Sequence, residues 1–137
     1  MKWFIFLLIA VVVILAAFFI LKNRTPAPAG NDMITVDTPQ ADSVVSSPVV
    51  IRGQARGNWY FEAVFPIRIY DANGKELGSV QGQAKSDWMT QDFVPFEAIL
   101  TFDKPTTPTG TLVLEKDNPS GLPQNAGSLT IPVRFSQ

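Results

Sequence analysis

The chain has 137 residues, a formal net charge of −1, and neither cysteine nor histidine. A charge this close to zero argues against nucleic acid as a partner, because nucleic-acid binding needs a basic surface. Without cysteine there is no disulfide, thiolate chemistry or lipid-modified cysteine, and without histidine the commonest general base and metal ligand is missing, so we expect no cofactor, no metal site and no enzymatic activity.

The first element is an apolar run from Trp3 to Leu21 that contains no charged or polar side chain, no glycine and no proline. A helix of about twenty such residues is long enough to cross a bilayer core of about 30 Å. We therefore predict a transmembrane anchor over residues 1–21, with the following domain outside the cytoplasm. A cleavable signal peptide is the alternative, because Ala27-Pro28-Ala29 resembles a cleavage site, although signal peptides usually have a shorter apolar segment.

A linker over residues 22–32 follows the apolar run. It alternates proline with small residues, a composition that resists helix and strand and favours an extended spacer. Basic residues lie on both sides of the apolar run, Lys2 before it and Lys22 and Arg24 after it, so the charge bias does not decide the orientation of the anchor. We expect the linker to hold the domain a short distance from the membrane.

From Met33 onward, proline and glycine divide the chain into short runs that leave no room for a long helix. Apolar residues at alternate positions or in short runs predict seven strands, at residues 34–36, 49–55, 59–70, 76–84, 94–102, 111–115 and 128–135. About seven short strands separated by turn signals are typical of an antiparallel β-sandwich of immunoglobulin-like type. We therefore predict one all-β domain over residues 33–137, preceded by a single transmembrane helix.

The longest strand signal runs from Trp59 to Tyr70 and leads into a hairpin turn at Asn73-Gly74. Its odd-numbered positions are all apolar, and successive side chains of a strand point to opposite faces. One face should therefore lie in the core and the other outside it. The predicted core residues are Phe61, Phe65 and Ile67, and the residues predicted on the opposite face are Tyr60, Glu62 and Arg68.

A series of short segments between Ile34 and Phe135 resembles a known family. They are Ile34-Thr35-Val36, Pro39, Val45, Pro48, Val50, Gly53, Ala55, Asn58-Trp59-Tyr60-Phe61-Glu62-Ala63, Asp71-Ala72-Asn73-Gly74, Asp87-Trp88-Met89-Thr90, Phe93-Val94-Pro95-Phe96-Glu97-Ala98 and Asn118-Pro119-Ser120-Gly121. In order and spacing they are similar to the Gmad2 domain, an immunoglobulin-like domain of bacterial spore-germination and related cell-surface proteins. The resemblance implies a sandwich on the outer side of a bacterial membrane, with a relation to sporulation or germination proteins, and it supplies no catalytic residues.

Glu62 and Glu97 are the carboxylates that a cell-wall glycan hydrolase would use. Two carboxylates about 5–10 Å apart can cleave a glycosidic bond when one of them has a raised pKa. The alternative is that both lie on a solvated sheet face and pair with Arg68 or Arg52. The run from Asp71 to Glu76 has some features of a calcium loop, but aspartate, asparagine and glycine are also what a hairpin turn requires, and we interpret it as a turn.

Tyr60, Trp88 and Met89 form the candidate binding surface, because aromatic residues at strand ends can anchor a protein partner or stack on a sugar. The alternative is that Trp59 and Trp88 cover the open end of the core. We expect a non-enzymatic binding module whose partner is an envelope protein or a cell-wall glycan. A structural spacer or an assembly subunit of an envelope complex is the second hypothesis.

Overall fold

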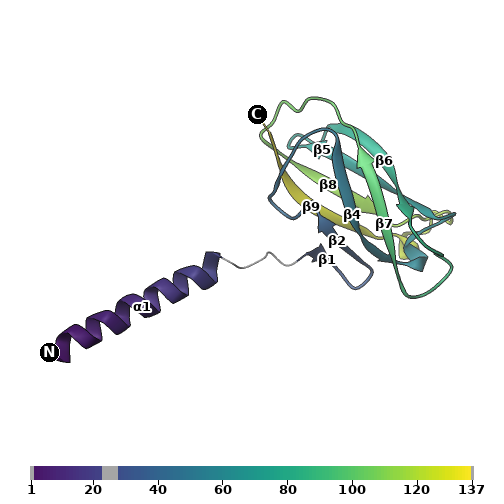
Figure 1. Ribbon diagram of the computed structural model, residues 1–137. Helices are drawn as coiled ribbons and strands as arrows, with labels where there is room; N and C mark the ends of the chain where they lie inside the picture. Colours follow the sequence, from purple (N-terminus) through teal and green to yellow (C-terminus); the bar gives the residue numbers. More distant parts are fainter. Residues whose placement is uncertain (1, 23–27, 137) are drawn as a thin grey trace.

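The computed structural model describes residues 2–22 and 28–136, which form a helix and a β-domain (Figure 1). Helix α1 (Lys2–Lys22) confirms the helix expected from the apolar run. Its described large hydrophobic side chains are all exposed, from 47% for Val11 to 84% for Trp3. Over the residues that the structure describes, no helix meets the combination of length and apolarity that crossing a membrane requires.

The β-domain contains nine strands in the described part of the chain, two more than expected. The two additional strands, β1 and β3, have two residues each. The strands are β1 (Ala29–Gly30), β2 (Ile34–Thr38), β3 (Val44–Val45), β4 (Val49–Arg56), β5 (Val64–Asp71), β6 (Glu76–Ala84), β7 (Phe93–Leu100), β8 (Thr109–Glu115) and β9 (Ser128–Phe135), with short 3₁₀ turns at Gly57–Trp59 and Pro123–Asn125.

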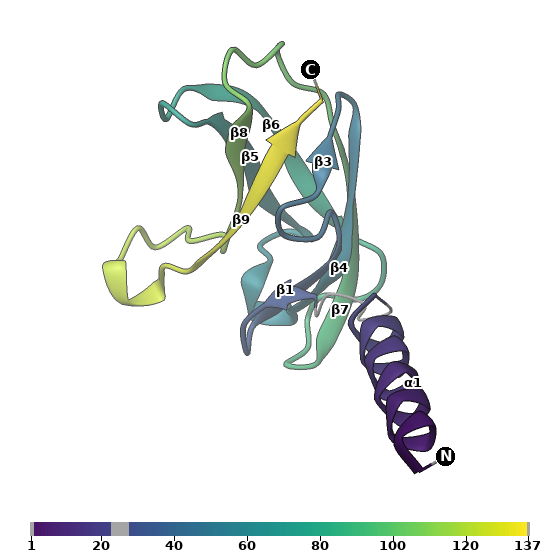
Figure 2. The ribbon, with the colours of Figure 1, turned by 90° about the vertical axis from the view of Figure 1, so that its left-hand side faces the viewer.

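The strands pair in the order β1-β2-β4-β7-β6-β5-β8-β9-β3 and fold over into a sandwich. One layer is β1-β2-β4-β7, and the other is β6-β5-β8-β9-β3, which Figure 2 shows facing each other. The layers are joined where β6 meets β7 through two residue pairs, Gln83 with Glu97 and Ala84 with Phe96. All pairs are antiparallel except β3 with β9. The predicted antiparallel sandwich is therefore confirmed.

Aromatic side chains from both layers meet at the centre of the core. The Phe65 ring of β5 stands edge-on to the Phe96 ring of β7, with the ring centroids 4.9 Å apart. Trp59 and Tyr60 also contact Phe65 edge-on, at 6.5 and 5.3 Å. Edge-to-face pairs of this kind add about 0.5–1.5 kcal/mol beyond the area they bury. Phe65 of β5 therefore packs both against β7 of the other layer and against Trp59 and Tyr60, which precede β5.

Two glycines make room for aromatic rings in the core. A Cβ atom at Gly82, the cross-strand neighbour of Phe65, would lie 2.7 Å from the Phe65 ring. A Cβ atom at Gly110 would lie 2.5 Å from the Phe135 ring and 2.2 Å from the Tyr70 carbonyl oxygen. Each glycine is therefore matched to one phenylalanine.

The longest predicted strand begins five residues later than expected. Residues Gly57–Trp59 form a 3₁₀ turn, and Glu62 and Ala63 have positive φ angles of 50° and 68°, so the strand starts at Val64. The turn changes the alternation of faces before Val64. Phe61 is exposed and Tyr60 is buried, so both of these predictions are wrong. The predictions are confirmed for Phe65 and Ile67, which are fully buried, and for Arg68 and Glu62, which lie outside the core.

Ordered β-structure begins at Ala29, within the stretch expected to be a spacer. Ala29 pairs with Val36 of β2, and the Asn31 carboxamide oxygen accepts hydrogen bonds from the backbone N–H groups of Met33 and Ile34. These bonds close a turn between β1 and β2. The end of the linker is therefore an edge strand of the first layer, whereas residues 23–27 of the expected spacer lie outside the described residues.

Candidate functional site

Four connections gather at one end of the sandwich, which we call the loop end. They are residues 31–33, 57–63, 85–92 and 116–127, which join β1 to β2, β4 to β5, β6 to β7 and β8 to β9. Because neighbouring strands run antiparallel, these connections lie on the same side, and Figure 1 shows the three longer loops together at the right of the domain. The loop end therefore brings together residues that are far apart in the sequence.

Loop 57–63 lies at the centre of the loop end and is bonded to a loop on either side. The Gly57 backbone N–H donates to the Asp92 carbonyl oxygen at 3.2 Å, and the Asp117 N–H donates to the Trp59 carbonyl oxygen at 2.9 Å. A Cβ atom at Gly57 would lie 1.8 Å from the Thr90 carbonyl oxygen. The three loops therefore hold one another through their backbones, in contacts close enough to require glycine.

Each of the three longer loops exposes one large apolar side chain. Phe61 is 43% exposed, Met89 is 75% exposed and Leu122 is 47% exposed. In the described part of the β-domain, the other exposed large apolar residues are Val44, Val50 and Ile99, all on strands. Exposed apolar side chains that lie on ordered loops around a polar rim are typical of contact surfaces.

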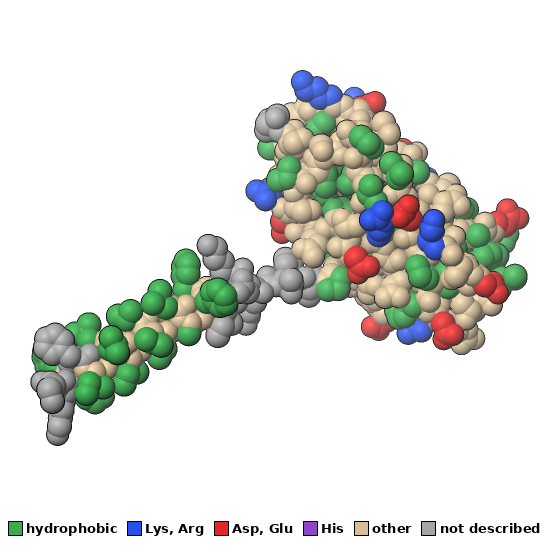
Figure 3. All heavy atoms as spheres, in the orientation of Figure 1, with side chains coloured by type: hydrophobic (Ala, Val, Ile, Leu, Met, Phe, Trp, Pro, Cys, Tyr) green, Lys and Arg blue, Asp and Glu red, His purple; other side chains and the backbone are tan. Residues whose placement is uncertain are grey.

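The same connections are rich in acidic side chains. The four connections contain five carboxylates against the two lysines Lys85 and Lys116, a formal charge of −3. Figure 3 shows hydrophobic and acidic side chains together over this end of the domain, at the right of the view. The five carboxylates are Asp32, Glu62, Asp87, Asp92 and Asp117.

Arg56 lies at the border of the loop end, and its guanidinium group is occupied by contacts within the domain. It stacks over the Phe93 ring at 4.1 Å, a cation–π contact. Its Nη1 donates to the Gln91 carbonyl oxygen at 3.3 Å, and its Nε donates to the Asp32 carbonyl oxygen at 3.4 Å. Arg56 therefore helps to hold two of the connections in place.

The predicted binding residues fall into three different environments. Tyr60 is 3% exposed, and its hydroxyl donates to the Val94 carbonyl oxygen at 2.6 Å, so the expected surface position is wrong. Burial raises the pKa of its phenol. Trp59 is buried and Trp88 is half-buried against the core, which confirms that they cover its end. Met89 is exposed, as the candidate surface requires.

Sequence reasoning missed Phe61 and Leu122 as exposed members of this surface. Phe61 was assigned to the core because it continued an alternating pattern that the turn at Glu62 and Ala63 interrupts. Leu122 follows Gly121, which has a φ of 66°, in a turn rich in proline and asparagine. A single apolar residue within such a turn is the one sequence signal that could have identified it.

The two candidate hydrolase carboxylates occupy different settings. Glu97 lies on the outer face of β7 opposite Arg52 of β4, whose Nε is 2.6 Å from a Glu97 carboxylate oxygen. The Arg52 guanidinium holds the pKa of Glu97 below its usual value, whereas a general acid needs a raised pKa. Glu62 lies in the exposed turn of the loop end. Arg68 pairs with Glu76 and Glu115.

The run from Asp71 to Glu76 is a turn, as interpreted from the sequence. The buried carboxylate of Asp71 accepts hydrogen bonds from the backbone N–H groups of Asn73 and Lys75, each at 2.9 Å. Gly74 adopts a φ of 82°, which glycine reaches without strain. No group of three acidic, histidine or cysteine residues that could hold a metal ion occurs in the described residues.

Hollows occur at both ends of the domain. Two lie at the loop end, one of about 450 Å³ lined by Met33, Arg56, Asn58, Gln91 and Asp92, and one of about 400 Å³ lined by Glu115, Lys116, Ala126, Gly127 and Ser128.

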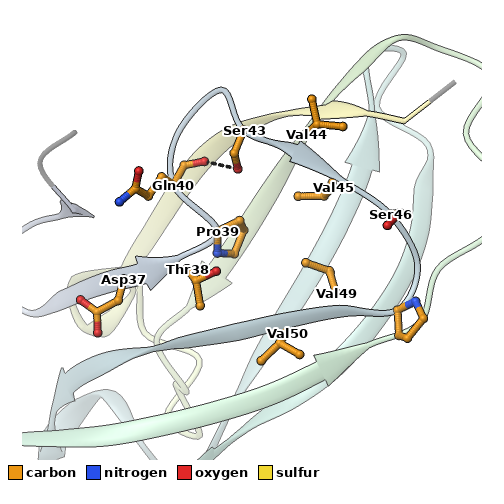
Figure 4. Close-up of a pocket in the computed structure, with 11 residues that line it drawn as sticks. Asp37, Thr38, Pro39, Gln40, Ser43, Val44, Val45, Ser46, Val49 and Val50 are labelled. Carbon is orange, nitrogen blue, oxygen red and sulfur yellow. Dashed lines mark hydrogen bonds between the residues drawn. The ribbon is translucent and has the colours of Figure 1, made fainter. Parts of the chain in front are cut away.

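A hollow of about 520 Å³ lies near the opposite end, where the chain passes from β2 to β3. Figure 4 shows residues of β3 and β4 on either side of it, with the Ser43 hydroxyl donating to the Gln40 carbonyl oxygen. Asp37 is the single charged residue among those that line it. This hollow therefore offers fewer charged groups than the loop end does.

An immunoglobulin-like β-sandwich has two facing antiparallel layers and loops grouped at its ends. This domain has both features, and β2 and β3, which follow each other in the chain, belong to different layers. Residues 33–122 match the family model of Gmad2, the immunoglobulin-like domain of bacterial spore germination, and the chain belongs to this family. The resemblance noted in the sequence is confirmed. No curated protein and no solved structure matches the chain.

Proposed function

We propose that the protein is a membrane-anchored, non-enzymatic binding module of a bacterial cell envelope, and that the loop end is its contact surface. The loop end carries this proposal. It presents three exposed apolar side chains, Phe61, Met89 and Leu122, on loops whose backbones hold one another. A preordered surface loses little conformational entropy when it binds, which favours affinity.

The membrane part of the proposal is supported by the composition of the N-terminal segment. Residues 3–21 contain no charged side chain, and the described side chains of α1 are exposed and apolar on all sides of the helix. A helix that is apolar all round needs an apolar environment. Strand β1 leads into the turn at residues 31–33, so the chain enters the domain in the direction of the loop end.

The non-enzymatic part is supported by the state of the carboxylates. Glu97 forms an ion pair with Arg52, and Asp71 is enclosed by the backbone of its own turn. Glycoside hydrolysis by Glu62 and Glu97 is not favoured, because the Arg52 guanidinium stabilises the ionised form of Glu97. Loss of peptidoglycan turnover in a Glu62→Gln or Glu97→Gln variant would restore that hypothesis.

Protease accessibility tests the location. Protease added to intact spheroplasts of cells that make the full-length protein should remove the β-domain and leave an N-terminal fragment in the membrane. Protection of the domain until lysis would overturn the exported orientation. Recovery of a soluble chain that begins near Gly30 would instead show that the N-terminal segment is a cleaved signal peptide.

Site-specific cross-linking in native membranes tests the contact surface. A photo-reactive amino acid in place of Met89 should form cross-links to an envelope component, whereas the same residue in place of Ile99, which is 59% exposed on strand β7, should not. Cross-links from both positions would favour an assembly subunit enclosed by its complex. Cross-links from neither position would favour a spacer.

A further inference from the structure

We propose that the partner of the loop end is a protein surface that carries apolar and basic side chains. The inference rests on the proposed function, because it names the kind of partner for the same surface. It is carried by the charge of the loop end, by the chemistry of its exposed side chains and by the burial of Trp59 and Tyr60. The loop end combines exposed apolar side chains with an excess of carboxylates, to which a surface with apolar and basic side chains is complementary.

The charge of the loop end is a large part of the charge of the domain. All twelve carboxylates of the chain lie in residues 29–137, together with eight of its eleven basic residues, so this part has a formal charge of −4. The four connections of the loop end contribute −3 of that charge. Complementary charge of this kind raises association rates and excludes partners of like charge. An acidic or neutral partner would gain nothing from this charge.

The exposed apolar side chains fit a protein better than a sugar. Stacking on a sugar ring needs the open face of an aromatic side chain. Of the aromatic residues in the loop-end connections, Trp59 and Tyr60 are buried, Trp88 is half-buried against the core, and Phe61 alone is exposed, at 43%. The most exposed member of the surface is Met89, whose flexible thioether side chain adapts to the irregular apolar surface of a protein partner. The two loop-end hollows on either side of loop 57–63 give the surface relief in which side chains of a partner can lie.

Two carboxylates of the loop end can be neutralised without loss of structural contacts. Glu62 has no hydrogen bond or ion pair to another side chain among the described residues. Asp92 is held by its backbone N–H and carbonyl oxygen, and its carboxylate makes one long contact, 3.4 Å to the Thr90 hydroxyl. Glu62→Gln and Asp92→Asn therefore change charge and little else. Asp103→Asn is the matched control, because Asp103 is an exposed carboxylate at the opposite end of the domain.

The test uses the full-length protein in native membranes with the photo-reactive residue at Met89. Cross-linking should give a protein adduct whose cross-linked segment carries net positive charge. Glu62→Gln and Asp92→Asn should each lower the yield about two- to fivefold, as expected for one exposed charge pair, and Asp103→Asn should leave it unchanged. Raising the salt concentration from about 0.05 to 0.5 M should lower the yield of the parent chain more than that of the double variant.

The outcomes separate this inference from the proposed function. A protein adduct whose yield is insensitive to Glu62→Gln, Asp92→Asn and salt would overturn the basic partner and leave the binding module standing. An adduct with a glycan, or with an acidic segment, would also overturn it. Absence of any adduct would overturn both. Thermal unfolding of each variant shows that a lower yield comes from charge and not from loss of the fold.

Discussion

The two ends of the sandwich are held together by different chemistry. At the end opposite the loop end, side chains join the connections. The Thr107 hydroxyl accepts a hydrogen bond from the Ala72 N–H at 3.1 Å, and the Ser47 hydroxyl accepts one from the Phe102 N–H at 2.9 Å. At the loop end, loop 57–63 is bonded to its two neighbours from backbone to backbone, and Arg56 at the border adds side-chain bonds to residues 32 and 91. One end therefore uses side chains for its own structure, and the other leaves Phe61, Met89 and Leu122 free to contact a partner.

The apolar side chains show the same difference. At the opposite end, Phe102 and Phe135 pack against each other with their ring centroids 5.8 Å apart, and both are buried. At the loop end, Trp59 closes the core, whereas Phe61, Met89 and Leu122 are exposed outside it. At the loop end, the residue that closes the core therefore differs from the exposed residues that we propose contact a partner. Substitutions can test whether this separation is real.

The largest effect is expected from Phe65→Ala. Phe65 is fully buried against Trp59, Tyr60 and Phe96, and truncation of a buried phenylalanine costs about 3–5 kcal/mol through lost contacts and the cavity left behind. Chemical denaturation of the full-length protein in detergent micelles measures this cost. Phe61→Ala is the matched control and should cost clearly less, because Phe61 is exposed. Equal costs would show that Phe61, although exposed at the loop end, also supports the fold.

The next largest effect is expected from Gly57→Ala. The new Cβ atom would meet the Thr90 carbonyl oxygen at 1.8 Å, so loops 57–63 and 85–92 must separate, at a cost of about 1–3 kcal/mol. The backbone N–H of residue 57, which donates to the Asp92 carbonyl oxygen, should exchange its hydrogen faster in the variant than in the parent protein. Gly127→Ala serves as comparison and should cost less, because its nearest neighbour, the Trp59 ring, would be 3.3 Å away and needs to shift by only a few tenths of an ångström. A stable, slowly exchanging Gly57→Ala protein would disprove the close contact of these loops.

Tyr60→Phe should have a moderate effect at pH 7 and a distinct effect at high pH. The lost hydrogen bond to the Val94 carbonyl oxygen is worth about 0.5–1.5 kcal/mol. Burial raises the pKa of Tyr60 above its ordinary value of about 10, so the unfolded state loses the proton first. The contribution to stability is therefore complete below pH 10 and is lost as the pH rises further. Urea denaturation at pH 7 to 11 should show a shallower decline for Tyr60→Phe than for Tyr70→Phe.

The smallest effect is expected from Glu97→Gln, which removes an exposed ion pair with Arg52 on the outer face of the sandwich. The Arg52 guanidinium lowers the pKa of Glu97, so the contribution is present above the usual carboxyl range and is lost as the pH falls through the lowered pKa. Melting temperatures of parent and variant should differ slightly at pH 7 and converge in acid. A difference that grows in acid would contradict this role of Arg52.

Much of the fold could be predicted because alternating apolar residues carry most of the information. The bounds of β6 and β9 agree with the predicted ranges, and the core positions of β7 follow its alternation. The error before Val64 has a physical cause. Glu62 and Ala63 both adopt positive φ angles, which neither residue type signals, and the apolar alternation continues through the turn by coincidence. Strand β3 has two residues and pairs with the distant β9, so no local pattern identifies it.

The candidate site was less predictable than the fold. Met89 and Tyr60 were both identified as candidate binding residues from positions near strand ends, but Met89 is exposed and Tyr60 is buried. Which face an aromatic residue takes near a strand end depends on the path of the preceding turn. That path is determined by contacts with loops 85–92 and 116–127, which are remote in the sequence.

The pairing of glycine with phenylalanine in the core has a consequence for how sequences of this family can diverge. Gly82 lies beneath the Phe65 ring and Gly110 beside the Phe135 ring, so neither glycine can acquire a side chain while its ring is present. A relative that has alanine or a larger residue at the equivalent of position 82 should therefore carry a smaller residue at the equivalent of position 65. Position 110 should remain glycine even where residue 135 is smaller, because a Cβ atom there would also lie 2.2 Å from the Tyr70 carbonyl oxygen. Positions 82 and 65 should thus change together during evolution, whereas position 110 should not change.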